Sequence, residues 1–232
     1  NAQRPERTHG THQSTRPGDL GIEVLESSAH DDLPHVSQVI EDCQKLGVRF
    51  ALDDFGTGYS SLTYLKRLPV SQLKIDQSFV RDMLDDPDDL AILEGVIGLA
   101  TAFRRDLIAE GVETVEHGEL LLDLGCECAQ GYGIGQPMSA ADLLSWASTW
   151  RPAAAWRNRR PAARGDLPLL FAAVEHRAWI QSVERGLADE RPVPPAALGQ
   201  CRFCISLAAP GLARHAGHAA YAALLRAHQD AH

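Results

Sequence analysis

The sequence reads Leu52-Asp53-Asp54-Phe55-Gly56-Thr57-Gly58-Tyr59-Ser60-Ser61-Leu62 at the point where a short apolar run, residues 48–52, comes to an end. The apolar run predicts a strand that ends at Leu52, the glycines predict a loop, and the Tyr-Ser-Ser segment predicts the start of a helix. Adjacent side chains diverge along a strand, so Asp53 and Asp54 can face one site only where the strand ends. Two neighbouring carboxylates raise each other's pKa unless a cation offsets them, and a hard divalent metal is a natural partner. The alternative is an Asx-turn with a helix cap.

On both sides of this stretch, short apolar runs alternate with helical segments. Strands are predicted over Leu20–Leu25, Val48–Leu52, Gln72–Ile75, Leu107–Ala109 and Cys126–Ala129. Helices are predicted over Leu33–Leu46, Ser60–Leu68, Leu84–Phe103, Val115–Leu124 and Ala140–Trp150. Successive βα units predict a parallel sheet with helices outside it, an α/β fold that forms part of a (β/α) barrel of the TIM type.

Polar side chains stand at the end of every predicted strand. In chain order they are Glu23 and Glu26, Asp53 and Asp54, Lys74 and Asp76, Glu110 and Glu113, and finally Gln130. In a (β/α) barrel the carboxyl ends of the strands converge on one face, where active sites are built. Acids and one lysine at consecutive strand ends therefore predict a functional site and not a solvated face.

Several motifs resemble those of the EAL-domain phosphodiesterases of bacterial signal transduction. They are Ile22-Glu23-Val24-Leu25-Glu26-Ser27, the stretch from Asp53 to Leu62, Leu73-Lys74-Ile75-Asp76, Ala109-Glu110-Gly111-Val112-Glu113 and Gln130-Gly131-Tyr132. The resemblance covers about residues 20–146. It implies a hydrolase that linearises cyclic di-GMP to the dinucleotide pGpG with the help of Mg²⁺ or Mn²⁺.

The resemblance also implies a role for each matching residue. Glu23 and Asp53 would be metal ligands, and Asp54 and Glu110 would serve a second metal or its bound water. Lys74 would orient the nucleophilic water, with Glu110 as the general base. Glu26 would brace the loop after Asp53. Asp76 and Glu113 would support this loop or the substrate. Gln130, Tyr132 and Pro137 would line the site beside the substrate.

The first part of the chain departs from the family pattern. The Glu-x-Leu signature and a later metal-binding Asn should precede Glu23, but residues 1–18 are polar, without periodicity, and read as a disordered leader. Because the chain begins with Asn, we expect a fragment in which about three of the eight barrel strands are absent. Unpaired sheet edges would favour association, for example as a homodimer. Weak activity is expected, and the alternative is an inactive cyclic di-GMP receptor or protein-interaction scaffold.

The remaining part of the chain predicts a linker and a second domain. Residues 147–168 are rich in Pro, Ala and Arg and read as a solvated linker, and residues 169–232 predict a small all-α helical bundle. His-x-x-Trp, a later Cys-x-Phe and a final His-x-x-x-His resemble the zinc-binding CZB domain. By that resemblance the Zn²⁺ ligands are His176, Cys201, His228 and His232. Cys204, or His215 with His218, could replace one of these ligands. The alternative to a zinc site is a helical bundle whose histidines are polar surface residues.

Composition limits the other possibilities. The chain has 232 residues with a net charge of −9, and residues 19–146 carry 24 acidic against 8 basic side chains. A duplex-DNA interface is not expected, because basic residues are not massed on this part. No apolar run approaches the length of a membrane span, and five cysteines without a secretory signal favour reduced thiols in the cytoplasm.

Overall fold

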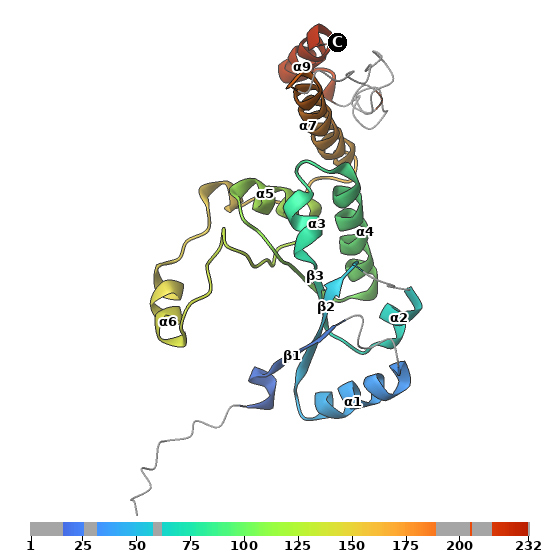
Figure 1. The fold of residues 1–232 in the computed structure, drawn as a ribbon, viewed down its shortest axis with the longest axis vertical. Helices are drawn as coiled ribbons and strands as arrows, with labels where there is room; N and C mark the ends of the chain where they lie inside the picture. Colours follow the sequence, from blue (N-terminus) through green and yellow to red (C-terminus); the bar gives the residue numbers. More distant parts are fainter. Residues whose placement is uncertain (1–15, 26–31, 58–61, 189–204, 206–214, 232) are drawn as a thin grey trace, which may run out of the picture.

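The structure is a computed structural model that describes residues 16–25, 32–57, 62–188, 205 and 215–231. Its centre is a parallel sheet in which neighbours along the chain are neighbours in space, in the order β1-β2-β3-β4 (Figure 1). The strands are β1 (Gly21–Leu25), β2 (Arg49–Phe55), β3 (Gln72–Ile75) and β4 (Asp106–Ala109). Because all strands run in parallel, their carboxyl ends lie at the same edge of the sheet.

Helices connect the strands and cover the sheet. The helices of this part are α1 (Leu33–Lys45), α2 (Leu62–Arg67), α3 (Gln77–Asp82), α4 (Pro87–Phe103), α5 (Val115–Leu124) and α6 (Ala140–Thr149). A continuous core fills the space between helices and sheet, with Leu52, Leu73 and Ile75 fully buried on the strands and Leu90 and Leu93 on α4. The α/β fold with a parallel sheet is therefore as predicted.

Two elements differ from the prediction. The helix predicted over residues 84–103 is present as α4, but the sequence does not predict the short helix α3 before it, where Asp76 acts as the cap by accepting a hydrogen bond from Ser78 N at 2.9 Å. Asp86 then caps α4 at Asp88 N. The fifth predicted strand is a single bridge between Ala109 and Ala129. Backbone bonds from Ala109 N to Cys128 O and from Gln130 N to Ala109 O flank this bridge.

The β1 side of the sheet is open in the part of the chain that the structure describes. There β1 pairs with β2 alone, and Ile22 and Leu25 are 36% and 46% exposed. On the opposite side, the segment after α5 lies beside β4 through the Ala109–Ala129 bridge. The described sheet is thus part of a barrel wall and not a closed ring.

The segment after α6 is packed on α5, although the sequence predicts a solvated linker. Trp156, in the short 3₁₀ helix η2 (Ala154–Trp156), donates its indole N–H to the Val115 carbonyl at 2.8 Å. Arg159 holds both carboxylate oxygens of Asp123 at 2.7 Å and Glu119 at 2.6 Å. This arginine is therefore committed to ion pairs, which the run of arginines in the sequence does not reveal.

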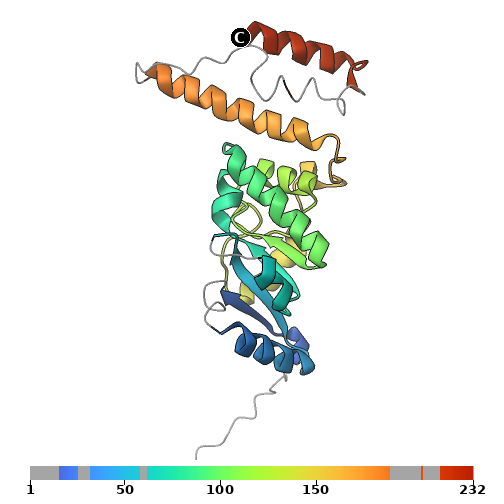
Figure 2. The same ribbon diagram turned by 90° about the vertical axis from the view of Figure 1, so that its right-hand side faces the viewer.

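Two long helices follow in the part of the chain that the structure describes. α7 (Leu167–Ala188) lies against α4, and α9 (Ala219–Ala231) lies on the far side of α7 (Figures 1 and 2). Val174 of α7 belongs to the main core, whereas Ala172 packs with Tyr221 and Leu225 of α9. Among the described helices, none is long and apolar enough to cross a membrane.

Candidate functional site

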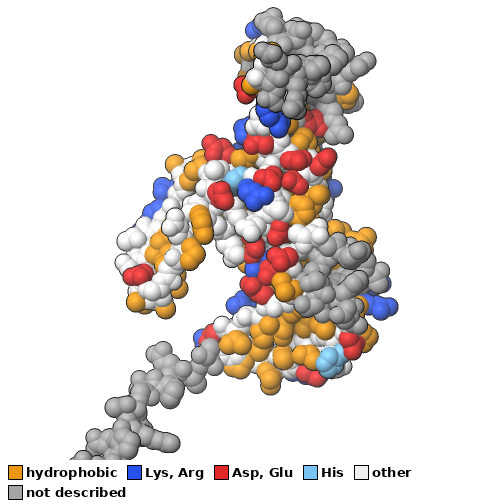
Figure 3. Space-filling model, viewed as in Figure 1, with side chains coloured by type: hydrophobic (Ala, Val, Ile, Leu, Met, Phe, Trp, Pro, Cys, Tyr) orange, Lys and Arg blue, Asp and Glu red, His pale blue; other side chains and the backbone are white. Residues whose placement is uncertain are grey.

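Lys74 is the centre of a cluster of charges at the carboxyl ends of the strands. Its side chain is 7% exposed, and its Nζ lies 2.9 Å from Glu23 Oε1, 2.8 Å from Asp53 Oδ1 and 2.6 Å from Glu110 Oε1. The four residues come from β1, β2, β3 and the end of β4, so the parallel register brings them together. In Figure 3, acidic side chains gather near the middle of the molecule, in the region of the strand ends and α3.

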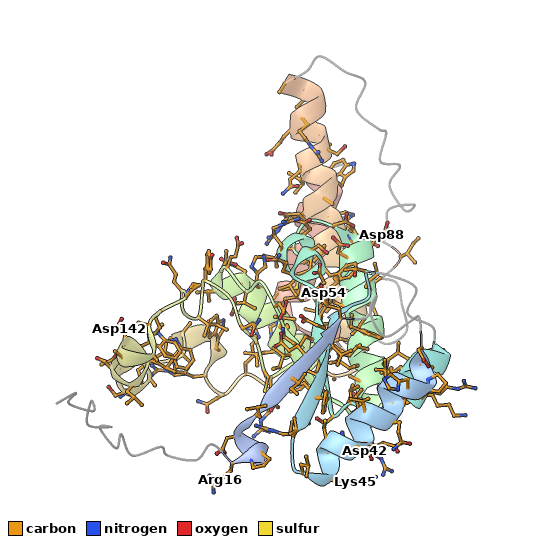
Figure 4. All side chains as sticks on the ribbon, turned by 60° about the horizontal axis from the view of Figure 1, so that its bottom comes forward. Arg16, Asp42, Lys45, Asp54, Asp88 and Asp142 are labelled. Atoms are coloured by element: carbon orange, nitrogen blue, oxygen red, sulfur yellow. The ribbon has the colours of Figure 1, made fainter. Side chains whose placement is uncertain are left out.

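Asp53 and Asp54 both reach this site because β2 is irregular where they stand. The strand continues to Phe55, past the predicted end at Leu52, and its register with β3 shifts between Leu52 and Phe55. Asp54 has a left-handed φ of 55°, which turns its side chain out of strict alternation. One oxygen each of Asp53, Asp54 and Glu110 lie within 4.8 Å of one another. Figure 4 shows Asp54 at the arrow end of the strands, far from Asp42 and Lys45 on α1.

The charges are not balanced by Lys74 alone. Burial, together with the charges of Asp53 and Asp76, raises the pKa of Asp54 above its ordinary value. Burial also raises the pKa of Glu110, although Lys74 works in the opposite direction. Burial by itself would lower the pKa of Lys74, but its three carboxylate partners raise it, so the lysine stays charged. Crowded carboxylates with raised pKa values fit a divalent cation, which would relieve their mutual repulsion.

A cavity of about 490 Å³ adjoins the cluster and shares Glu110 with it. Glu113, Gln130, Tyr132 and Pro137, all singled out in the sequence, line this cavity. Gln130 donates its amide to Glu110 Oε1 at 2.7 Å, which joins the cavity to the charged cluster. Sequence reasoning missed Gln77 and Gln136 in the lining. Gln136 could have been predicted, because it stands between Tyr132 and Pro137, which the sequence already assigns to the site.

Other predicted residues lie elsewhere or outside the described part. Glu26 belongs to the residues that the structure does not describe, as do Cys201, Cys204 and His232. Asp76 serves as the cap of α3 and is electrostatically coupled to Asp54. His176 of α7 and His228 of α9 come together, with ring centroids 5.3 Å apart. His215 makes an ion-pair contact of 2.8 Å with Asp166, which ties it to a carboxylate outside the predicted zinc set.

Comparison with known proteins gives this arrangement a family. The family model described as "EAL domain" matches residues 6–137, more than half of the chain, so the chain belongs to the EAL-domain family. The matched range begins ahead of Gly21, where the first described strand starts, and includes part of the segment 1–18. Members of this family are cyclic di-GMP phosphodiesterases, and the fold and the charged cluster agree with that class.

Two curated relatives come from Pseudomonas aeruginosa. The bifunctional diguanylate cyclase/cyclic di-GMP phosphodiesterase MucR is 45% identical over 132 residues, which are 57% of this chain and 19% of MucR. The cyclic di-GMP phosphodiesterase PA2567 is 42% identical over 127 residues, which are 55% of this chain and 22% of the relative. The chain therefore spans about a fifth of the length of these relatives.

Solved structures agree. The PaMucR phosphodiesterase in complex with c-di-GMP shares 45% identity at a TM-score of 0.54, covering 56% of this chain and 53% of that one. The EAL domain of Mycobacterium smegmatis DcpA shares 41% identity at a TM-score of 0.55, covering 58% and 60%. Klebsiella pneumoniae BlrP1, 32% identical at a TM-score of 0.50 over 53% of this chain and 31% of that one, has been solved with c-di-GMP and manganese and with c-di-GMP and calcium.

Proposed function

We propose that this chain binds cyclic di-GMP in the cavity beside Glu110 and hydrolyses it to pGpG with the help of Mg²⁺ or Mn²⁺. The observation that carries the proposal is the cluster of Glu23, Asp53 and Glu110 around a buried Lys74, with Asp54 beside it. The adjoining cavity has Gln130 bonded to Glu110, so one residue borders both the charges and the space for a ligand. The similarity to PaMucR solved with c-di-GMP supports the choice of substrate.

The carboxylates fit two roles in this proposal. Glu23, Asp53, Asp54 and Glu110 would hold the metal ions, which when bound would acidify a water and offset the phosphate charge. Glu110 is placed to accept a proton, because its pKa is raised and it faces the cavity. Lys74 stays charged between the carboxylates and would fix the position of the attacking water. A domain this acidic would repel an anionic dinucleotide unless cations were present.

The test is a turnover assay on the whole chain. With Mg²⁺ and cyclic di-GMP, chromatography should show pGpG, and Asp53→Asn should lower kcat at least about a hundredfold, the scale for loss of an electrostatic group at the reacting centre. Asp42→Asn is the matched control, because Asp42 lies exposed on α1, where its side chain pairs with Lys45 and Gln38. Equal turnover of the Asp53 variant and the wild type would contradict the assignment of Asp53 to the catalytic site.

A second candidate is a receptor that binds cyclic di-GMP without turnover. It is favoured by the open side of the described sheet, where the Glu23 side chain on β1 is 56% exposed. Binding measured by calorimetry without detectable pGpG would select this function. Absence of both binding and turnover would contradict both candidates.

The raised pKa values of Asp54 and Glu110 predict how stability depends on pH and metal. The metal-free fold holds these two protons more tightly than the unfolded chain does, so the contribution of Asp54 and Glu110 to stability should be lost as pH rises through their raised pKa values. Mg²⁺ binds the ionised form, so the gain in Tm on adding Mg²⁺ should be larger at pH 8 than at pH 5. Thermal melts with and without Mg²⁺ at both pH values measure this. A gain independent of pH would show that these carboxylates do not bind the ion.

We propose in addition that the last two helices hold one Zn²⁺. His176 and His228 support this, because rings on two different helices lie 5.3 Å apart and His228 is 5% exposed. Cys201 and His232 would complete a tetrahedral site of the Cys/His type.

A zinc titration of the whole chain tests this second proposal. The titration is carried out in excess Mg²⁺, so that Mg²⁺ and not Zn²⁺ occupies the acidic cluster. A thiolate-containing site prefers Zn²⁺ and stays available to it. One Zn²⁺ should bind with release of protons, because the thiol must ionise. Cys201→Ser should weaken binding strongly, and Cys204→Ser and His215→Ala should change it little. If Cys204→Ser is the costlier cysteine change, the ligand assignment is wrong even though zinc binds; spread, non-stoichiometric uptake would indicate surface histidines only.

A further inference from the structure

His117 is a buried histidine whose ring makes three contacts with backbone atoms. It lies at the third position of α5 and is 5% exposed. Its Nδ1 lies 3.3 Å from Glu113 N and 3.3 Å from Thr114 N, and its Nε2 lies 3.2 Å from the carbonyl oxygen of Arg81 at the end of α3. Backbone N–H groups can only donate and a carbonyl can only accept. The contacts therefore assign the neutral ring with its proton on Nε2.

This ring nitrogen serves two successive amides of the segment 110–114. On the strand side the segment is held by backbone bonds, from Glu110 N to Ile75 O at 3.2 Å and from Val112 N to Gln130 O at 3.0 Å. On the helix side the amides of Glu113 and Thr114 both point at His117 Nδ1. His117 Nδ1 is thus the acceptor that fixes the helix-side end of the segment, and its loss would leave both amides to water.

The same segment is fastened to both ends of α3. At the start of α3, Gly111 with a φ of 77° lies so close to Gln77 that an added Cβ would stand 2.7 Å from the Gln77 Cβ. At the end of α3, His117 reaches the Arg81 carbonyl. Gln77, Glu110, Gly111 and Glu113 all line the cavity. A shift of the segment at His117 would therefore move one wall of the ligand site.

We propose that His117 is a positioning residue for the dinucleotide site: its neutral ring orients Glu113 and Glu110 through the backbone of the segment 110–114. The proposal rests on the proposed function, because it assigns the cavity to cyclic di-GMP. A proton on Nδ1 would present a donor to the two backbone N–H donors, so the contacts require the Nε2-protonated ring. The charged groups around the ring are Arg81 and Asp82 of α3 and Glu113 and Glu116 of its own segment; Asp82 is paired with Arg81 at 3.0 Å.

The chain offers a matched control at an equivalent position. His35 occupies the third position of α1, and its backbone N–H is accepted by the cap Asp32, as that of His117 is accepted by Thr114. The His35 side chain is exposed. The informative substitutions are His117→Leu, which removes the acceptor, and His117→Gln, whose amide can accept from the two N–H groups and donate to Arg81 without titrating. The controls are His35→Leu and His35→Gln.

The experiment measures cyclic di-GMP affinity of the whole chain by calorimetry in Ca²⁺, the ion present with c-di-GMP in one BlrP1 structure. His117→Leu should weaken binding about tenfold, on the scale of one lost hydrogen bond, and His117→Gln should restore it to within about twofold. Both His35 variants should bind as the wild type does.

A second readout is independent of the ligand. Nitrogen NMR of the histidine rings at pH 7.5 should show His117 with its proton on Nε2, and the amides of Glu113 and Thr114 should exchange faster in His117→Leu. A charged ring, a proton on Nδ1, or unchanged binding and exchange in His117→Leu overturns the proposal. If the wild type binds no cyclic di-GMP, the proposed function fails and the ring and exchange measurements alone decide on His117. If His117→Leu does not fold, the ring tautomer of the wild type and the affinity and amide exchange of His117→Gln decide.

Discussion

Replacing Lys74 by methionine should nearly abolish turnover, with kcat lowered by about two to three orders of magnitude. The ammonium group bonds three carboxylates at 2.6–2.9 Å and is almost fully buried, so no solvent cation takes its place in the same geometry. In the metal-free protein the loss of this charge leaves Asp53 and Glu110 half-buried and without their cation. Tm should then fall, by an amount that corresponds to roughly 3 kcal/mol, the lower end for breaking a buried ion pair, because Glu23 is exposed.

The control for this prediction is Lys45→Met, since Lys45 also pairs with an aspartate but on the exposed surface of α1. That variant should keep the wild-type kcat and change stability by less than about 1 kcal/mol. Mg²⁺ should recover part of the stability of Lys74→Met, because the ion offsets the same carboxylates, but it should not recover turnover. If Mg²⁺ restores both, Lys74 is a structural counter-ion and does not position the attacking water.

The sequence is informative where the physical rule is local. A strand followed by a polar residue places that residue at the carboxyl edge of a parallel sheet, so the order of apolar runs and polar residues suffices to place Glu23, Asp53, Lys74 and Glu110 together. The register of β1 to β4 confirms this part of the fold. Gln130 joins them as expected, through its bond to Glu110.

The sequence is less informative where tertiary contacts decide. Neither the left-handed Asp54 nor the register shift in β2 follows from a pattern of apolar residues, yet both turn the second aspartate to the site. The residues around Cys126–Ala129 have strand propensity but form a single bridge, from Ala109 to Ala129. Arg159 has the sequence context of a solvated charge, and only its fold partners on α5, 36 and 40 residues away in sequence, reveal the ion pairs.

His117 shows the same limit at the scale of one ring. In sequence it is a histidine near a helix start, and a cap or a surface role is the ordinary expectation. Its two N–H donors are sequence neighbours, but the Arg81 carbonyl that completes the site is 36 residues away. Long-range contacts of this kind are set by packing and leave no periodic signal in the sequence.

Substituting Gly131 by alanine should disturb both the fold and the site. An added Cβ would stand 2.3 Å from Val112 N and 2.3 Å from Val112 O, and backbone atoms cannot move aside as a flexible side chain can. The backbone bonds from Val112 N to Gln130 O and from Gly133 N to Val112 O lie on either side of this contact and should break or lengthen. We expect a loss of about 2–3 kcal/mol in the free energy of unfolding, the scale of overpacking in a close-packed region.

Activity should fall further than stability alone explains, because Val112 lies between Glu110 and Glu113, which both line the cavity. Turnover measured well below the Tm of the variant, where it is fully folded, should still be reduced at least about tenfold, as expected for a small misplacement of a catalytic group. Gly98→Ala on α4 is the matched control: an added Cβ meets nothing within 4 Å there, and alanine in a helix interior should raise stability by about 0.5–1 kcal/mol. Wild-type turnover in folded Gly131→Ala would show that Val112 can move without displacing the two glutamates, and that the segment is held chiefly from the His117 side.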